Sequence, residues 1–200
     1  MALRTGMTWL IDELKSLTNA TEDHFEEIDL QSILDRNKKT YQDVVLYPTP
    51  FNSGGSYIYR DYYIPRDVGS WVELPEDDIV NEHFYLQDYL HNPVLFGIGD
   101  TKAVYYQDTH KITFNTDTGG KLAYLTYYVY DMYAAAATLW EKTAALRSNY
   151  IDVRMDNHTL ALSQTRDFCL DRAKYYRSKS MKDSTTRLVR SDQGVGYGSN

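Results

Sequence analysis

The feature that most limits the possible folds is a change in the spacing of apolar residues along the chain. Both ends carry apolar residues at helical spacing, whereas residues 41–127 are interrupted by proline and glycine and contain only short alternating runs. Short alternating runs between turn residues predict β-strands. The sequence therefore predicts an α+β protein, with a small bundle of about four helices and an inserted antiparallel β region.

Helix-forming patterns recur at both ends of the chain. The predicted helices cover residues 8–18, 29–39, 129–148 and 163–180. Thr8, Asp29 and Ser163 are the candidate N-caps, because their side-chain oxygens can accept a hydrogen bond from a free amide of the first turn. The third helix is rich in alanine, the strongest helix former. The basic residues Lys38 and Lys39 are expected to close the second helix, where they complement its dipole.

The middle of the chain is expected to form short strands and one clear hairpin. The predicted strands cover residues 44–47, 57–59, 70–74 and 103–106. Residues 111–115 and 122–127 are expected to pair across a turn in which Gly119 and Gly120 supply positive φ angles.

These patterns divide the chain into four parts. The parts are N-terminal helices over residues 1–40, an inserted β region over 41–127, a helix pair over 128–180 and a tail over 181–200. The tail is rich in serine, glycine and charge, so it has too little apolar surface to fold alone. We expect it to extend and to gain structure by binding a partner.

Composition excludes some functions and favours others. The net charge of −7 argues against a protein that simply binds nucleic acid, because neutralising phosphates needs a basic surface. Nineteen tyrosines suit protein interfaces, although tyrosine is also common in β-strands. A single cysteine, the lack of a signal-like segment and the lack of a long apolar run predict a soluble protein made in the cytoplasm, without a membrane partner.

Motifs for chemistry are not found in the sequence. It has no phosphate-binding loop, no zinc-ligand spacing and no nucleophile motif, so no catalytic residue, metal or cofactor is expected. The remaining candidates for chemistry are clusters of acidic residues, which a two-metal enzyme would need. We interpret the main cluster as a solvated acidic face, formed by Glu73, Glu76, Asp77 and Asp78.

Packing surface is concentrated in the last two predicted helices. Small residues there, Ala134 and Ala137, allow a neighbouring backbone to approach closely. The bulky residues expected to anchor the packing of subunits are Tyr133, Trp140, Phe168 and Tyr176.

Several of these segments resemble the head-tail connector proteins, or head-completion adaptors, of long-tailed bacteriophages. In that family a Tyr-Asp-x-x-Ala-Ala-Ala helix is followed by Trp-Glu and then by a helix that opens with Ser-Gln and ends in Ala-Lys-Tyr-Tyr. The matching positions here are Leu34 to Asn37, Gly119-Gly120, Tyr130 to Ala136, Leu139 to Glu141, Ser163-Gln164 and Ala173 to Arg177.

The resemblance implies a structural role rather than an enzymatic one. Members form a ring, usually a dodecamer, in the neck of the virion, after assembly in the host cytoplasm. The ring joins the portal to the stopper or tail and extends the channel through which DNA passes without specific binding. The C-terminal segment grips the portal, which assigns that role here to Arg187, Leu188, Val189, Arg190 and Tyr197.

Three alternatives remain open from the sequence. The chain is also compatible with a tail-completion or stopper protein of the same neck. A metal-dependent enzyme that uses the acidic insertion is a second alternative, and a carbohydrate-binding β module that uses exposed tyrosines and Trp71 is a third.

Overall fold

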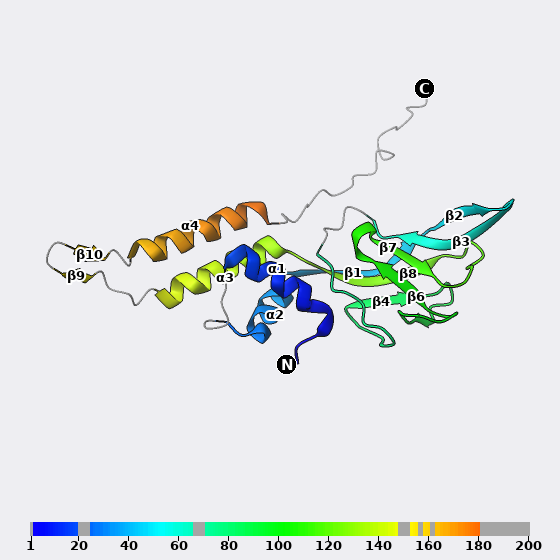
Figure 1. Ribbon diagram of the computed structural model, residues 1–200, viewed down its shortest axis with the longest axis horizontal. Helices are drawn as coiled ribbons and strands as arrows, with labels where there is room; N and C mark the ends of the chain where they lie inside the picture. The colour runs from blue at the N-terminus through cyan, green and yellow to red at the C-terminus, as the bar shows by residue number, and fades with distance from the viewer. Residues whose placement is uncertain are drawn as a thin grey trace, which may run out of the picture.

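The helices gather at one end of an elongated molecule and the β-sheets at the other (Figure 1). The computed structural model describes residues 2–19, 25–65, 71–147 and 163–180, together with the backbone of residues 153–155 and 158–160. Within these residues the protein contains four α-helices and two four-stranded antiparallel sheets, as expected for an α+β protein.

Helix α3 is the element on which the other helices pack. The helices are α1 (Thr8–Thr18), α2 (Glu27–Arg36), α3 (Met132–Leu146) and α4 (Ser163–Lys179). The apolar faces of α1, α2 and α3 share one buried cluster, to which α1 and α2 contribute side chains such as Leu10 and Leu30 and α3 contributes Ala136 and Leu139. Because alanines line this face of α3, the neighbouring helices approach it closely.

The limits of α1 agree with the sequence prediction, but its N-cap and the ends of α2 and α3 do not. The N-cap of α1 is Met7, and the Thr8 hydroxyl instead donates a hydrogen bond to the carbonyl of Thr5. Helix α2 begins at Glu27, so Asp29 lies in its first turn rather than at its cap. It also ends at Arg36, because the next residues pair as a strand. Helix α3 begins only after Asp131, because the residues before it belong to a strand.

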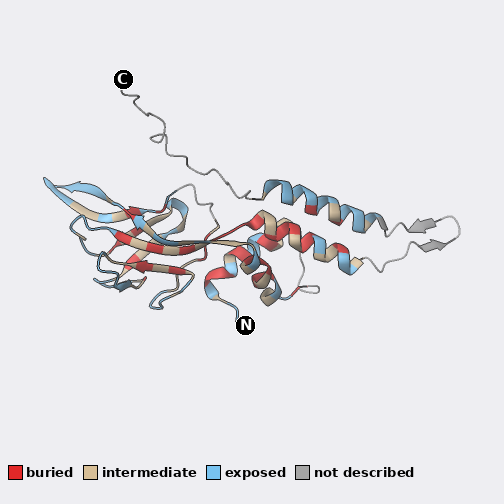
Figure 2. Ribbon diagram, turned by 180° about the vertical axis from the view of Figure 1, so that it is seen from behind, coloured by how far each residue is buried: buried red, intermediate tan, exposed pale blue. Residues whose placement is uncertain are grey.

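Two sheets enclose the second core. The first sheet has the order β1-β8-β4-β5 and the second the order β2-β3-β7-β6. The strands are β1 (Lys38–Leu46), β2 (Pro48–Ser53), β3 (Ser56–Tyr63), β4 (Phe84–Gln87), β5 (Pro93–Val94), β6 (Ala103–Tyr106), β7 (Lys111–Phe114) and β8 (Ala123–Tyr130). Buried side chains from both sheets form one cluster (Figure 2).

The hairpin expected between residues 111–115 and 122–127 is wrong. Strand β7 pairs with β3 and β6, whereas β8 pairs with β1 and β4 in the other sheet. The two strands bury Ile112 and Leu125 in the same core cluster, so they face one core from different sheets and do not pair with each other. Gly119 and Gly120 do have positive φ, but they lie in the segment that crosses from one sheet to the other.

The other predicted strands agree more closely with the structure. Residues 44–47, 57–59 and 103–106 overlap β1, β3 and β6. Of the described part of residues 70–74, only Val72 pairs, through a single bridge to Val129. The strands extend from Lys38 to Tyr130 and thus beyond the range 41–127. Two short strands, β9 (Val153–Met155) and β10 (His158–Leu160), pair between α3 and α4.

Candidate interaction site

Helices α3 and α4 lie side by side and form an arm that extends away from α1 and α2 (Figure 1). Small side chains make the contact between them. Cys169 and Ala173 of α4 are buried against Trp140 and Ala144 of α3. Cys169 is completely buried and packs as a small hydrophobic side chain.

Aromatic contacts fix α4 along α3 at two levels. Near the outer end, Trp140 meets Phe168 edge to face, with ring centroids 6.0 Å apart. Near the inner end, Tyr133 and Tyr176 are stacked at 6.2 Å. The Tyr176 hydroxyl also donates a hydrogen bond of 2.9 Å to the carbonyl of Leu17 in α1. These contacts hold α4 in one position on the rest of the protein.

The six residues predicted to pack subunits therefore make many of their contacts within the chain. Ala137 and Trp140 are buried, and Tyr133, Ala134 and Tyr176 are half-buried. Phe168 differs, because 51% of its surface stays exposed beyond Trp140. It is the predicted anchor with the most surface left for a partner, and its role in subunit packing stays a prediction.

The outer face of α4 carries aromatic rings with cations above them. Phe168, Arg172, Tyr175 and Lys179 recur at helical spacing and form what we call the arm stripe. The Arg172 guanidinium lies 5.2 Å from the centre of the Phe168 ring, and the Lys179 ammonium lies 4.4 Å from that of Tyr175. Helix α4 contains five basic and two acidic residues, a net charge of +3.

The predicted acidic face is correct only in part. Glu73 is not solvated, because its side chain has no exposed surface. Glu76 is half-buried, whereas Asp77 and Asp78 are exposed. Asp78 forms an ion pair with Lys102, a cation that lies just beyond the acidic stretch in the sequence.

Glu73 belongs instead to a buried polar junction between the helices and the sheets. The Arg4 guanidinium donates a 2.9 Å hydrogen bond to one Glu73 oxygen and a pair of bonds, at 2.6 and 3.0 Å, to the Asp35 carboxylate. The Tyr130 hydroxyl donates to the other Glu73 oxygen at 2.7 Å. One arginine thus joins the N-terminus, α2, the segment before β4 and the end of β8.

Burial affects the pKa values of Tyr130, His83 and Arg4 at this junction. It raises the pKa of the Tyr130 hydroxyl, which keeps it neutral as a donor to Glu73. Burial also lowers the pKa of His83, although Glu73 nearby partly opposes this. Burial opposes the charge of Arg4 too, but its hydrogen bonds to Asp35 and Glu73 outweigh that effect and raise its pKa above the usual value.

Two motifs that carry the family resemblance meet at this junction. Asp35 and Asn37 come from the first motif, and Tyr130 and Asp131 from the second. The Asp131 amide donates a 2.7 Å hydrogen bond to the carbonyl of Asn37, and the Asp131 carboxylate caps α3 by accepting from the amide of Ala134. The second motif therefore ends a strand and starts the arm.

Sequence reasoning missed the central residue of this junction, Arg4. The N-terminal segment close to it contained one usable signal, a glycine at position 6. A side chain there would overlap the carbonyl oxygen of Leu74, so the backbones of these two segments touch. The sequence contains no signal that pairs Arg4 with Glu73, which lies 69 positions away.

The structure supplies fewer observations on the remaining candidate sites. Trp71 is half-buried and meets Tyr133 edge to face at 5.1 Å. The described residues contain no group of three or more potential metal ligands. Among them there is also no helix long and apolar enough to cross a membrane. The five predicted portal-gripping residues, Arg187, Leu188, Val189, Arg190 and Tyr197, lie outside the described residues.

Comparison with known proteins gives no family for this chain. It matches no protein-family model, and neither a curated protein nor a solved structure is significantly similar to it.

Proposed function

We propose that this protein is a structural adaptor in the neck of a tailed bacteriophage. It forms a ring, most simply a dodecamer, that joins the portal to the stopper or tail and extends the DNA channel. The observation that carries the proposal is the junction around Arg4 and Glu73. There, two motifs that resemble those of head-tail connector proteins meet and fix the base of a projecting two-helix arm.

The helical end supports the proposal in its packing. Helices α1 and α2 cover one part of α3, and α4 joins them through the hydrogen bond from Tyr176 to Leu17. We regard these four helices as the bundle of the adaptor and the two sheets as an insertion into it. The bundle then presents the arm, and the exposed Phe168 on it, to a neighbouring subunit.

The charge of the chain suits a wall along which DNA moves. A net charge of −7 repels phosphates, so an acidic channel retains no DNA during ejection. The alternative of a metal-dependent enzyme is less well supported, because Glu73 is occupied by Arg4 and Tyr130, and Asp78 by Lys102.

The proposal is tested with the portal ring of the same phage. The masses of the full-length protein and of a chain ending at Ser180 are measured by native mass spectrometry, each with and without the portal. We expect the full-length chain to bind the portal and the shortened chain to lose that binding.

A point-substituted chain sharpens this test. Leu188→Ser with Val189→Ser should weaken portal binding, whereas Ser184→Ala, a matched change in the same tail, should leave it unchanged. A protein that ignores the portal but binds the tail tube would instead be a stopper or tail-completion protein. A monomer that binds neither would overturn the proposal.

A further inference from the structure

Two loops at the sheet end lie against each other and form one surface. The loop before β4 meets the loop before β6, where the Asp78 amide donates a 3.1 Å hydrogen bond to the carbonyl of Phe96. The ion pair between Asp78 and Lys102 joins the same two loops. We call residues 75–82 and 95–102 the loop pair.

The loop pair exposes apolar side chains at its centre. Ile98 lies between two glycines with positive φ, and 94% of its surface is exposed. Ile79 and Val80 on the neighbouring loop are 55% and 53% exposed. Exposed β-branched residues grouped on two adjoining loops are typical of a surface that binds another protein.

A hollow beside Ile98 can receive a side chain. It has a volume of about 340 Å³ and is lined by residues that include Leu74, Phe96 and Tyr105. An aromatic ring that enters such a hollow is a common anchor of protein interfaces.

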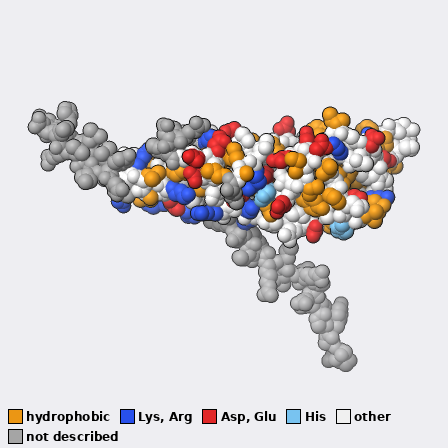
Figure 3. All heavy atoms as spheres, turned by 90° about the horizontal axis from the view of Figure 1, so that it is seen from below, with side chains coloured by type: hydrophobic (Ala, Val, Ile, Leu, Met, Phe, Trp, Pro, Cys, Tyr) orange, Lys and Arg blue, Asp and Glu red, His pale blue; other side chains and the backbone are white. Residues whose placement is uncertain are grey.

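The charges around the loop pair are opposite to those of the arm. The loop pair contains five acidic residues (Glu76, Asp77, Asp78, Glu82 and Asp100) and one basic residue, Lys102, which gives a net charge of −4. Helix α4 has a net charge of +3. Figure 3 shows apolar side chains among acidic ones over the sheet end, and Lys and Arg side chains gathered toward the helical end.

The arm also presents an apolar centre. Phe168 and Tyr175 of the arm stripe are 51% and 46% exposed, and Arg172 and Lys179 lie over their rings. Each surface thus has an apolar centre and a charged rim, and the two rims have opposite signs. Complementary surfaces of this kind associate specifically.

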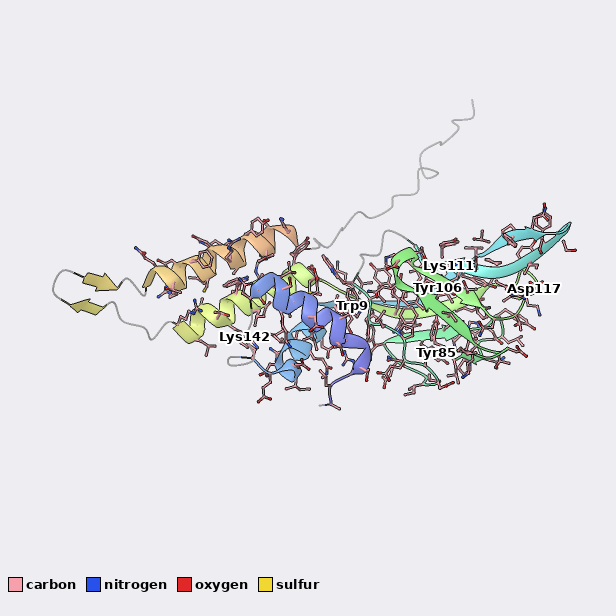
Figure 4. All side chains as sticks on the ribbon, viewed as in Figure 1. Trp9, Tyr85, Tyr106, Lys111, Asp117 and Lys142 are labelled. Carbon is pink, nitrogen blue, oxygen red and sulfur yellow. The ribbon has the colours of Figure 1, made fainter. Side chains whose placement is uncertain are left out.

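The two surfaces lie on different parts of the molecule, the arm stripe on a helix and the loop pair beside the sheets. Figure 4 shows these two parts, with Lys142 on α3 in the helical part and Asp117 at the far end of the sheets. We infer that the arm stripe of one copy docks on the loop pair of the next copy, with the Phe168 ring placed beside Ile98. Such a head-to-tail contact uses two different surfaces and closes into a ring when its rotation permits. The inference rests on the ring of the proposed function and names the surfaces that build it.

Charge exchange tests the contact directly. Asp77→Lys, Glu82→Lys and Asp100→Lys together change the net charge of the loop pair from −4 to +2, and Arg172→Glu with Lys179→Glu reverses the arm stripe. Each reversed protein alone should need about tenfold more protein for half-assembly, because like charges then face each other across the contact. A mixture of the two reversed proteins brings opposite charges together again at every contact when the two kinds of copy alternate, and so does a single chain that carries all the substitutions. That chain should assemble within about threefold of the natural protein.

Matched controls separate the contact from a general effect of charge. Asp12→Lys, Glu13→Lys and Asp29→Lys together change exposed residues of α1 and α2 by the same charge as the loop reversal, and should leave assembly unchanged. A second test mixes an Ile98→Cys protein with a Phe168→Cys protein under mild oxidation. A disulfide-linked dimer of the two is expected, and neither protein alone should give that yield.

The outcomes distinguish the contact from the adaptor function. If both reversed proteins assemble normally and the cysteine pair does not link, the inference is overturned while tail-dependent portal binding still stands. If the natural chain stays monomeric at every concentration and ignores the portal, both proposals fail. If reversal of the arm abolishes binding to a DNA duplex and leaves assembly intact, the arm is a nucleic-acid surface and the inference is overturned.

Discussion

Arg4 has the most demanding role of any single residue in this protein. Its guanidinium compensates the carboxylate of Glu73, which has no exposed surface, and at the same time holds Asp35 of α2. A buried charge is tolerated only when it is paired and fully hydrogen-bonded. The Tyr130 hydroxyl completes that pairing on the second Glu73 oxygen.

Removal of Arg4 should therefore destabilise the fold strongly. We expect Arg4→Met to lower the free energy of unfolding by about 3–5 kcal/mol, because Glu73 is left buried without its cation. Urea denaturation followed by circular dichroism measures the change. Arg36→Met, at an exposed position of α2, is the matched control and should cost less than about 0.5 kcal/mol. Equal midpoints for the two variants would contradict the role of the junction.

His83 should make stability depend on pH. Burial lowers its pKa below the ordinary 6.5, so the unfolded chain binds a proton more readily than the folded protein. The contribution of His83 is therefore complete above about pH 6.5 and is lost as the pH falls from there through its lower folded pKa. Urea midpoints at a series of pH values measure this loss. His83→Phe should flatten that part of the profile, and an unchanged slope would exclude His83 as its source.

Among the elements, the arm depends on a few side chains between α3 and α4. Trp140 of α3 is 9% exposed and packs against the buried Cys169 and Ala173 of α4. Trp140→Ala should cost about 3–5 kcal/mol if the arm unfolds with the rest of the protein. Hydrogen exchange of the α4 amides measures the effect on the arm itself. Leu146→Ala, at a position 56% exposed on the same helix, should change neither measurement appreciably.

Local patterns predicted the helices better than they predicted the strand pairing. The limits of α1 and the start of α4 follow from apolar spacing and agree with the structure. The end of α2 was placed too late, because Lys38 and Lys39 resemble a basic helix end but pair instead with Tyr130 and Val129 of β8. Their partner strand is far away in the sequence, so no local pattern indicates it.

The same limit explains the errors at the candidate sites. Glu73 was assigned to a solvated face together with its acidic neighbours in the sequence, whereas its partner Arg4 is 69 positions away. The six residues predicted to pack subunits lie on the last two helices, where Trp140 contacts Phe168 and Tyr133 contacts Tyr176 within the chain. A sequence does not separate a contact within the chain from one between subunits, so their role between subunits stays a prediction.

At the scale of the whole molecule, opposite charges lie on different parts of an elongated body. The net charge of −7 is unevenly spread, with a basic α4 in the helical part and an acidic loop pair beside the sheets. An elongated body with opposite charges on two different parts favours head-to-tail association over symmetric pairing, because symmetric pairing brings like charges together. The two surfaces share no residue, so each copy can use both at once.

Assembly should consequently weaken as salt is added. The Debye length falls from roughly 10 Å at 0.1 M salt to roughly 3 Å at 1 M, so charges on the rims of the contact are increasingly screened. We expect the concentration for half-assembly, measured by sedimentation velocity, to rise steadily over this range. Ile98→Ser should raise that concentration at every salt level without changing the slope, because it removes apolar contact and leaves the charges. Assembly that strengthens with salt would show that the charged rims do not contribute to it, and would contradict the charge pairing proposed between the arm stripe and the loop pair.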